Sequence, residues 1–185
     1  MKWRNLLMPK EIVMDEATAT PTFARFAVEP LERGFGNTIG NAIRRTLLSS
    51  IQGASVTAVK IGGTLHEFST IKGVKEDVTD VVLNLKQMIV KMHCDDPRIV
   101  TIDVDKKGEV TAADIKTDPE IEILNPDLLI ATCTKKTKLH MDILIGHGRG
   151  YVPAEQHDLE DFEIGLIPID SNFTPVVHVT YEGKN

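Results

Sequence analysis

The segment from Leu31 to Ser50 constrains the fold of this chain more than any other, because it combines helical periodicity with several glycines. Four apolar residues recur at every fourth position, so an α-helix gathers them on one face. They are Phe35, Ile39, Ile43 and Leu47. An apolar face of this kind must be buried, so the segment predicts a helix that packs against a partner.

Two of the glycines, Gly36 and Gly40, lie four residues apart on an adjoining line of the same helix. Glycine destabilises a helix interior, and the expected compensation is the close approach of another helix backbone. A phosphate-binding loop is not indicated, because Gly40 follows Gly36 by four residues and precedes Asn41 rather than lysine.

The paired arginines Arg44 and Arg45 lie about 100° apart around the helix axis, so we expect one of them to have a partner elsewhere. Two interpretations stay open at this point. Both side chains can lie on a solvated face near the helix C-terminus, where cations are favoured. Alternatively they dock onto another protein, since arginine is enriched at interface hot spots.

This segment closely resembles the first long helix of the bacterial RNA polymerase alpha subunit, amino-terminal domain. Three further runs resemble that family in the same order, and together the four span most of the 185 residues. They are LHEFST at 65–70 with GVKED at 73–77, VTAADI at 110–115, and GRGYVPA at 148–154. The chain is therefore identified as a member of that family.

The remaining pattern has few helices and many short strands, which predicts an α+β fold. The resemblance implies that this fold is divided. Residues 1–52 and 174–185 would form a dimerisation domain with a discontinuous chain, and 53–173 an inserted, mostly β second domain. The family continues with a further strand and a long helix, so we expect the dimerisation domain to be incomplete at its C-terminal end. A fragment and a differently built dimer are both open.

The resemblance also implies roles for particular residues. The apolar stripe would pack against its copy in a second alpha chain, and Arg45 and Leu48 would contact the beta subunit. Lys86 fills the place associated with the beta-prime subunit. The implied function is a non-catalytic scaffold in DNA-directed RNA polymerase, a nucleotidyltransferase, with no cofactor on this chain. The magnesium and zinc of that enzyme are expected on the large subunits.

The composition agrees with protein partners in the cytoplasm. The formal charge of −6 and pI near 5.5 argue against a general nucleic-acid surface, although a local basic patch can exist within an acidic total. We expect no direct DNA contact from this chain. Cys94 and Cys133 form no Cys-x-x-Cys pair, and no apolar run is long enough to span a membrane. No pattern of metal ligands or catalytic residues is recognisable.

The other predicted elements are mostly strands, separated by turn signals at Gly62-Gly63, Asp95-Asp96-Pro97, Lys107-Gly108 and Asn125-Pro126. Helical spacing predicts a second helix over Val74–Lys86. The expected strands are Lys10–Glu16, Pro21–Glu29, Ala54–Ile61, Met88–Met92, Ile99–Val104, Ile121–Leu124, Leu128–Thr132 and Lys138–Ile145.

The run from Gly146 to Pro153 is the second unusual stretch, because three glycines alternate around His147 and Arg149. One interpretation is a bulge that leaves the preceding strand. Another is that Arg149 and Tyr151 are anchors for a large polymerase subunit, which the resemblance favours. A third is a small independent binding protein whose backbone holds an anion in this loop. An enzyme with a novel site has no residue constellation to support it.

Overall fold

The computed structural model describes residues 7–64, 67–157 and 165–183. They belong to two compact units. We call residues 1–47 with 178–185 the helical unit and residues 48–177 the sheet unit. The expected α+β class is confirmed, since two α-helices occur with antiparallel sheets. The assignment of dimerisation and inserted domains stays a prediction.

The helical unit begins with an antiparallel pair of short strands, β1 (Glu11–Met14) and β2 (Phe26–Glu29). Helix α1 (Phe35–Ser49) follows and crosses the unit boundary at Leu47. All three elements lie where the sequence predicts them. The sequence analysis expected Gly36 and Gly40 of α1 to face another helix. Within this chain they do not. They face the chain's own Tyr181 and Gly183, and a Cβ added at Gly40 would lie 2.5 Å from the Tyr181 ring.

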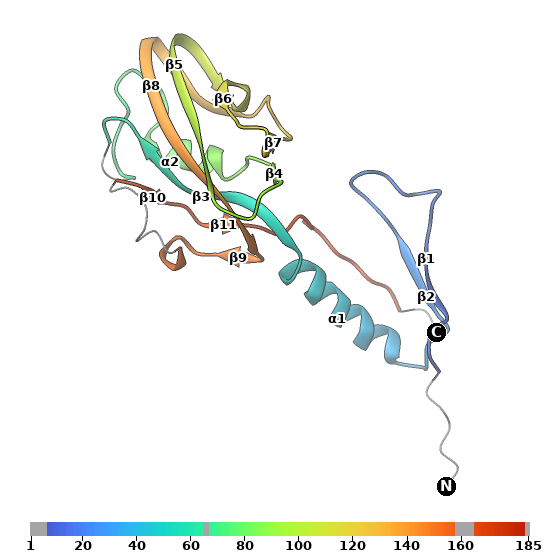
Figure 1. The fold of residues 1–185 in the computed structure, drawn as a ribbon. Coiled ribbons are helices and arrows are strands. Elements are labelled where there is room, and N and C mark those ends of the chain that lie inside the picture. Colours follow the sequence, from blue (N-terminus) through green and yellow to red (C-terminus); the bar gives the residue numbers. More distant parts are fainter. Residues whose placement is uncertain (1–6, 65–66, 158–164, 184–185) are drawn as a thin grey trace. The chain divides into compact units, whose positions relative to one another are not determined.

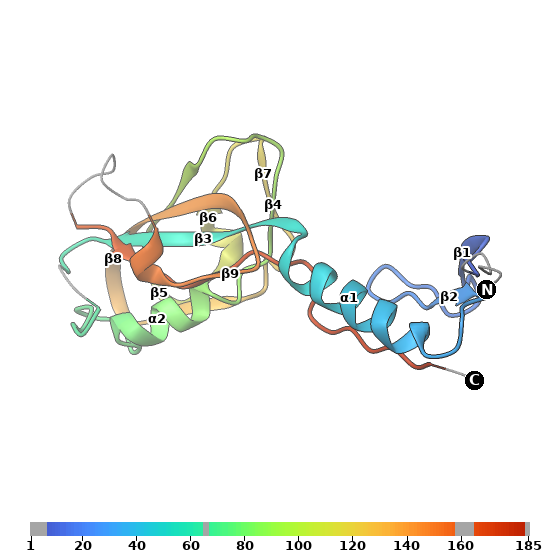
Figure 2. The same ribbon diagram turned by 90° about the horizontal axis from the view of Figure 1, so that it is seen from below.

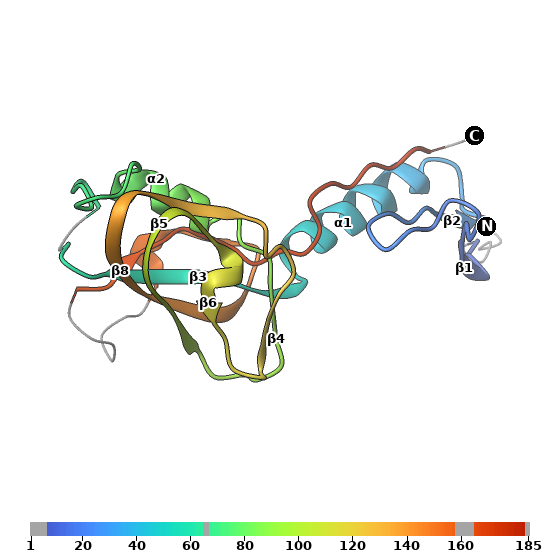
Figure 3. The same cartoon turned by 90° about the horizontal axis from the view of Figure 1, so that it is seen from above.

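A five-stranded antiparallel sheet forms the frame of the sheet unit, in the order β10-β3-β8-β5-β6 (Figure 1). Its two longest strands are β5 and β8, which lie side by side along nearly their whole length (Figures 1 and 3). The bounds are β3 (Gln52–Ile61), β5 (Arg98–Thr111), β6 (Ile115–Lys116), β8 (Leu129–Arg149) and β10 (Ile167–Pro168).

Helix α2 (Val78–Leu85) packs beside this sheet (Figure 2). It begins four residues later than expected, because Val74 bridges to Cys133 and Asp77 caps the helix by accepting a 2.8 Å hydrogen bond from the Asp80 N–H. Its inner face buries Val78, Val81 and Leu85 completely.

Two further strand pairs complete the sheet unit. Strand β4 (Val90–Met92) pairs with β7 (Ile121–Ile123), and β9 (Tyr151–Val152) pairs with β11 (Ser171–Asn172). Two single-turn 3₁₀ helices are η1 (Ala112–Asp114) and η2 (Ala154–Gln156). No helix among the described residues is both long and apolar enough to cross a membrane.

The strand predictions around the long hairpin are partly wrong. The two strands expected at Leu128–Thr132 and Lys138–Ile145 are one continuous strand, β8, and Lys107-Gly108 is not a turn. The register passes from Lys106↔Thr137 to Gly108↔Cys133, so the irregular residues form a bulge inside the hairpin. A bulge keeps the ladder on both sides intact, which is why polar residues there do not end the strands.

Candidate functional site

The predicted dimerisation residues line α1, and that helix has no buried residue. Phe35 is 39% exposed and Ile43 is 42% exposed, while Ile39 and Leu47 are half-buried. The helix was expected to bury its apolar stripe, and within this chain it does not. The stripe is therefore available to another molecule.

The helical unit also exposes large apolar side chains outside the helix. Large apolar side chains are exposed on and beside its strand pair: Met8, Ile12, Val13, Met14, Phe23 and Phe26. Every buried hydrophobic residue in the described part of the chain belongs to the sheet unit. The helical unit thus has no buried apolar core of its own among the described residues.

One of the paired arginines has a partner at a distance in the sequence, as expected. Arg44 donates a 3.1 Å hydrogen bond from Nε to the Val179 carbonyl, within the helical unit. The neighbouring Arg45 is exposed and Leu48 is half-buried. The contact with Val179 holds the segment that follows the sheet unit along α1.

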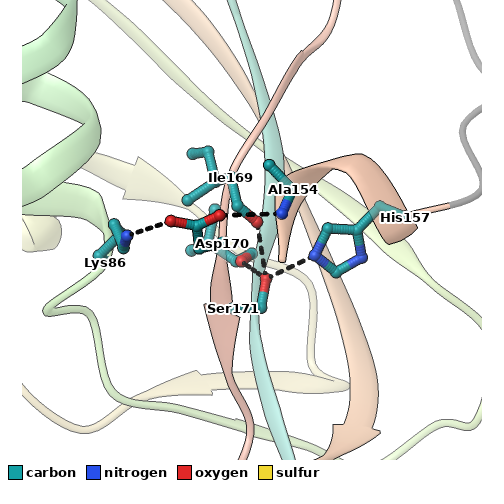
Figure 4. Close-up of polar contacts among 7 residues, drawn as sticks. Lys86, Ala154, His157, Ile169, Asp170 and Ser171 are labelled. Atoms are coloured by element: carbon teal, nitrogen blue, oxygen red, sulfur yellow. Dashed lines mark hydrogen bonds and ion pairs between the residues drawn. The ribbon is translucent and has the colours of Figure 1, made fainter. Parts of the chain in front are cut away.

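Lys86 and Tyr151, which come from different elements, both lie near the Asp170 carboxylate, which the sequence analysis did not single out. Figure 4 shows the contacts of Asp170 with Lys86 and Ala154. Lys86 is the C-cap of α2, and its Nζ lies 3.0 Å from Asp170 Oδ2. The other carboxylate oxygen accepts a 2.9 Å hydrogen bond from the Ala154 N–H. The Tyr151 side chain, on β9, lies close enough to Asp170 to interact with the carboxylate electrostatically.

These contacts set the ionisation of the cluster. The Ala154 N–H and then the Lys86 ammonium lower the pKa of Asp170, so the carboxylate is charged at neutral pH. Loss of hydration and the nearby Asp170 carboxylate raise the pKa of Tyr151. The result is a charged acceptor that holds one ammonium, beside one neutral phenol. Lys86 is 31% exposed and Tyr151 62% exposed, so both remain accessible.

The next residue, Ser171, fixes the same segment from the inside (Figure 4). Its fully buried hydroxyl donates to the carbonyls of Val56 and Ile169, at 2.5 and 3.0 Å, and lies 3.0 Å from His157 Nε2. One hydroxyl proton shared between two carbonyls leaves the oxygen to accept from the imidazole. Burial lowers the pKa of His157, which favours the neutral ring. A catalytic serine must donate its proton to the base, whereas the Ser171 hydroxyl donates to carbonyls and accepts from His157. The Ser171–His157 contact therefore has a structural role.

The run from Gly146 to Pro153 differs from two of the interpretations offered above. Gly146 to Arg149 continue β8 in regular register with β3, so there is no bulge leaving the strand. Residues 146–149 are extended and paired with β3, so they do not form an anion-binding nest.

The glycines in this run serve close packing. A Cβ added at Gly148 would lie 2.5 Å from the Phe173 ring. His147 lies between two carbonyls, with Nε2 2.9 Å from Cys94 O and Nδ1 3.3 Å from Gly53 O. Arg149 ends β8 with an exposed side chain.

The sequence analysis missed Asp170 and Ser171, although the sequence around them has the periodicity of a strand. Buried residues alternate with more exposed ones from Ile167 through Ile169 and Ser171 to Phe173, which is the period of a strand. Asp170 is one of the more exposed positions in that pattern. The pattern does not reveal its partners, Lys86 at the end of α2 and Ala154 in η2, because they lie far away in the sequence.

Comparison with known proteins places most of the chain in one family. Residues 59–174 match the family described as the RNA polymerase Rpb3/RpoA insert domain.

Among the described residues, no group of three or more histidine, cysteine, aspartate or glutamate side chains is arranged to hold a metal ion.

Several curated relatives are named DNA-directed RNA polymerase subunit alpha. The one from Oceanobacillus iheyensis is 54% identical over 170 residues, covering 92% of this chain and 54% of the relative. The one from Symbiobacterium thermophilum is 56% identical over 160 residues, covering 86% and 51%. The one from Rhodopirellula baltica is 47% identical over 182 residues, covering 98% and 55%. The chain spans about half the length of the curated relatives it matches.

Proposed function

The chain belongs to the RNA polymerase Rpb3/RpoA insert domain family, and from this we propose that it is a scaffold subunit of a DNA-directed RNA polymerase. In this proposal two copies dimerise and then assemble the beta and beta-prime subunits. The names of relatives at 47–56% identity support the role in that enzyme. The proposal gives this chain no catalytic residue, and it assigns magnesium and zinc to the large subunits.

The observation that carries the proposal is the uncovered apolar surface of the helical unit. Contiguous exposed apolar patches mark protein interaction sites, and the stripe on α1 gathers four apolar side chains on one helix face. A small unit without a buried core is marginal on its own, and association is one way to stabilise it. The stripe on α1 therefore calls for a protein partner.

A second copy of the chain suits this surface. Closed dimers use the same patch on both subunits, and a stripe of four apolar residues at helical spacing can pack against its own copy. The pair would bury Phe35, Ile39, Ile43 and Leu47 from both chains. Because burial removes apolar surface from water, the dimer is expected to be favoured by the hydrophobic effect.

Contact with the large subunits is assigned to polar and aromatic anchors. Arg45 and Leu48 are proposed to contact beta, and Lys86 beta-prime. Arg149 and Tyr151 are proposed as further large-subunit contacts. Arginine and tyrosine are common interface anchors. The Asp170 carboxylate supports this assignment, because it holds the Lys86 side chain in a defined position, beside Tyr151, before any partner binds.

Dimerisation is tested by light scattering on the purified chain. We expect twice the chain mass of 20.5 kDa. Ile43→Asp places a charge in the stripe and should halve the measured mass. Ile99→Asp is the matched control, since Ile99 is also about half exposed but lies on β5. A wild-type chain that remains at 20.5 kDa at every concentration would refute the dimer.

Assembly is tested by co-expression with the beta and beta-prime subunits. The expected complex contains two copies of this chain. Arg45→Ala should lower the yield of beta, and Lys86→Glu that of beta-prime, while the isolated chain keeps its fold. Lys91→Glu, an exposed lysine on β4, is the control. Normal yield of both large subunits with Arg45→Ala and Lys86→Glu would remove these residues from the interface.

A further inference from the structure

A concentration of exposed lysines lies on the sheet unit, away from the Asp170 cluster and in a chain whose formal charge is −6. We call this set the lysine patch. It comprises six exposed side chains: Lys72, Lys75, Lys107, Lys135, Lys136 and Lys138. None of them is part of the proposed scaffold contacts, so the patch requires a separate account.

Three neighbouring segments bring these lysines together. Cys133 on β8 pairs with Gly108 on β5 and bridges to Val74 in the loop before α2. Residues 72–75 therefore lie beside β8 on one edge, and residues 105–109 on the other, as Figures 1 and 3 both indicate. Neighbouring strands are about 4.8 Å apart, so the three segments span about 10 Å.

The bulge inside the hairpin aims several of the lysines outward. The register passes from Lys106↔Thr137 to Gly108↔Cys133, which leaves Lys107 opposite residues 134–136. Bulges redirect side chains out of the regular alternation. The geometry is held by the Gly73 carbonyl, which accepts hydrogen bonds from the Thr134 N–H at 2.9 Å and the Thr134 hydroxyl at 3.1 Å.

The acidic groups nearby do not neutralise the patch. Asp105 lies 3.8 Å from Lys136, and the Glu76 carboxylate accepts hydrogen bonds from Thr132. Glu109 is exposed on β5 opposite Thr132. Lys106 is half-buried and paired with Asp114 at 2.6 Å, so neither member of that pair is counted. Six lysines against these three carboxylates and that of Asp77, two residues after Lys75, leave a positive excess.

The composition of the patch points to a nucleic-acid backbone. Its cationic groups are all lysine ammonium groups, which lack the rigid guanidinium fork of arginine. Lysines are point charges that can contact phosphates without fixed geometry, and duplex DNA presents one charge per about 1.7 Å. At about 0.1 M salt the Debye length is about 10 Å, so the distant negative charges of the chain are largely screened at the patch.

We propose that the lysine patch contacts the phosphate backbone of duplex nucleic acid, without sequence preference. This departs from our expectation that the chain makes no DNA contact. That expectation followed the net charge and the family resemblance, and neither of them describes a local surface. The proposal goes beyond the scaffold function and does not depend on it.

The test is fluorescence anisotropy of a labelled 20-bp DNA duplex with the full 185-residue chain, between 50 and 200 mM salt. Each phosphate contact contributes about −0.9 to the slope of log K against log salt, so three to five contacts predict a slope of about −2.7 to −4.5. The variant Lys135→Gln/Lys136→Gln/Lys138→Gln should reduce the size of this slope by about 2.7.

The matched control is Lys10→Gln/Lys91→Gln/Lys116→Gln, which changes the net charge equally at exposed positions outside the patch. It should leave the slope unchanged. Absence of DNA binding by the wild type at 50 mM salt, or equal effects of the two triple variants, would overturn the proposal. Polyglutamate that binds more tightly than DNA of equal charge would also overturn it, by indicating an acidic protein partner.

Discussion

Replacing Asp170 by asparagine removes the charge that holds Lys86 and the Ala154 N–H, with almost no change in shape. Hydrogen bonds to a charged group contribute about 1.5–3 kcal/mol when they are shielded. The Asp170 side chain is 37% exposed, and ion pairs near the surface contribute only about 0–1 kcal/mol. We therefore expect Asp170→Asn to lower the free energy of unfolding by about 1–2 kcal/mol at pH 7.

The same substitution has a defined pH dependence. The Ala154 N–H and the Lys86 ammonium lower the pKa of Asp170 in the folded chain. A carboxyl whose pKa is lower in the folded state contributes its stability above the unfolded pKa of about 3.9, and loses it as the pH falls through the folded pKa. The difference between wild type and Asp170→Asn should therefore be complete near pH 7 and shrink as the pH falls below about 4.

Urea unfolding followed by circular dichroism at pH 7 and pH 3 measures this difference. The control is Asp103→Asn, since Asp103 pairs with Lys116 at 3.5 Å and both side chains are more than 60% exposed. We expect the control to change the free energy by less than about 0.5 kcal/mol. The reasoning is refuted if Asp170→Asn is equally destabilising at both pH values, or no more destabilising than the control.

Two further predictions concern the packing of the sheet unit. Gly148→Ala should destabilise it by about 1–3 kcal/mol in urea, because the added methyl group meets the Phe173 ring. Gly146→Ala, whose methyl group would lie 3.5 Å from Thr57 Cγ2, should change it far less, and equal effects would contradict this account. Burial opposes ionisation of Glu76, but the Thr132 N–H and hydroxyl outweigh it and lower the pKa. Glu76→Gln should therefore be destabilising at pH 7 and progressively less so below about pH 4, and a difference that does not vary with pH would argue against the charged hydrogen bonds.

Sequence periodicity gave the position of α1 and the identity of its apolar face, since both depend only on spacing within one segment. It could not show that the face is uncovered, because burial depends on what other segments do. The glycine line illustrates the same limit. Its need for a close neighbour was predicted correctly, but the neighbour is the Tyr181 ring rather than a helix.

The long hairpin shows a different limit. Polar residues and a glycine favour turns that would end a strand, and this hairpin contains several of them: Lys107-Gly108 and the lysines at 135, 136 and 138. Pairing between β5 and β8 on both sides of this point overrides them, because thirteen register pairs support the ladder and a bulge absorbs the irregular residues. Long-range pairing of this kind is not encoded in a local window.

The two units differ in the source of their stability, because buried apolar residues are found in only one of them among the described residues. The sheet unit contains every buried apolar residue of the described chain, so its stability comes from its own core. The described part of the helical unit has no such core, so association can contribute a larger share of its stability. If a second copy covers α1, the stability of the helical unit must rise with protein concentration, whereas that of the sheet unit must not. A scaffold built in this way would couple the folding of its interface to assembly, and its sheet unit would already be rigid when the large subunits bind.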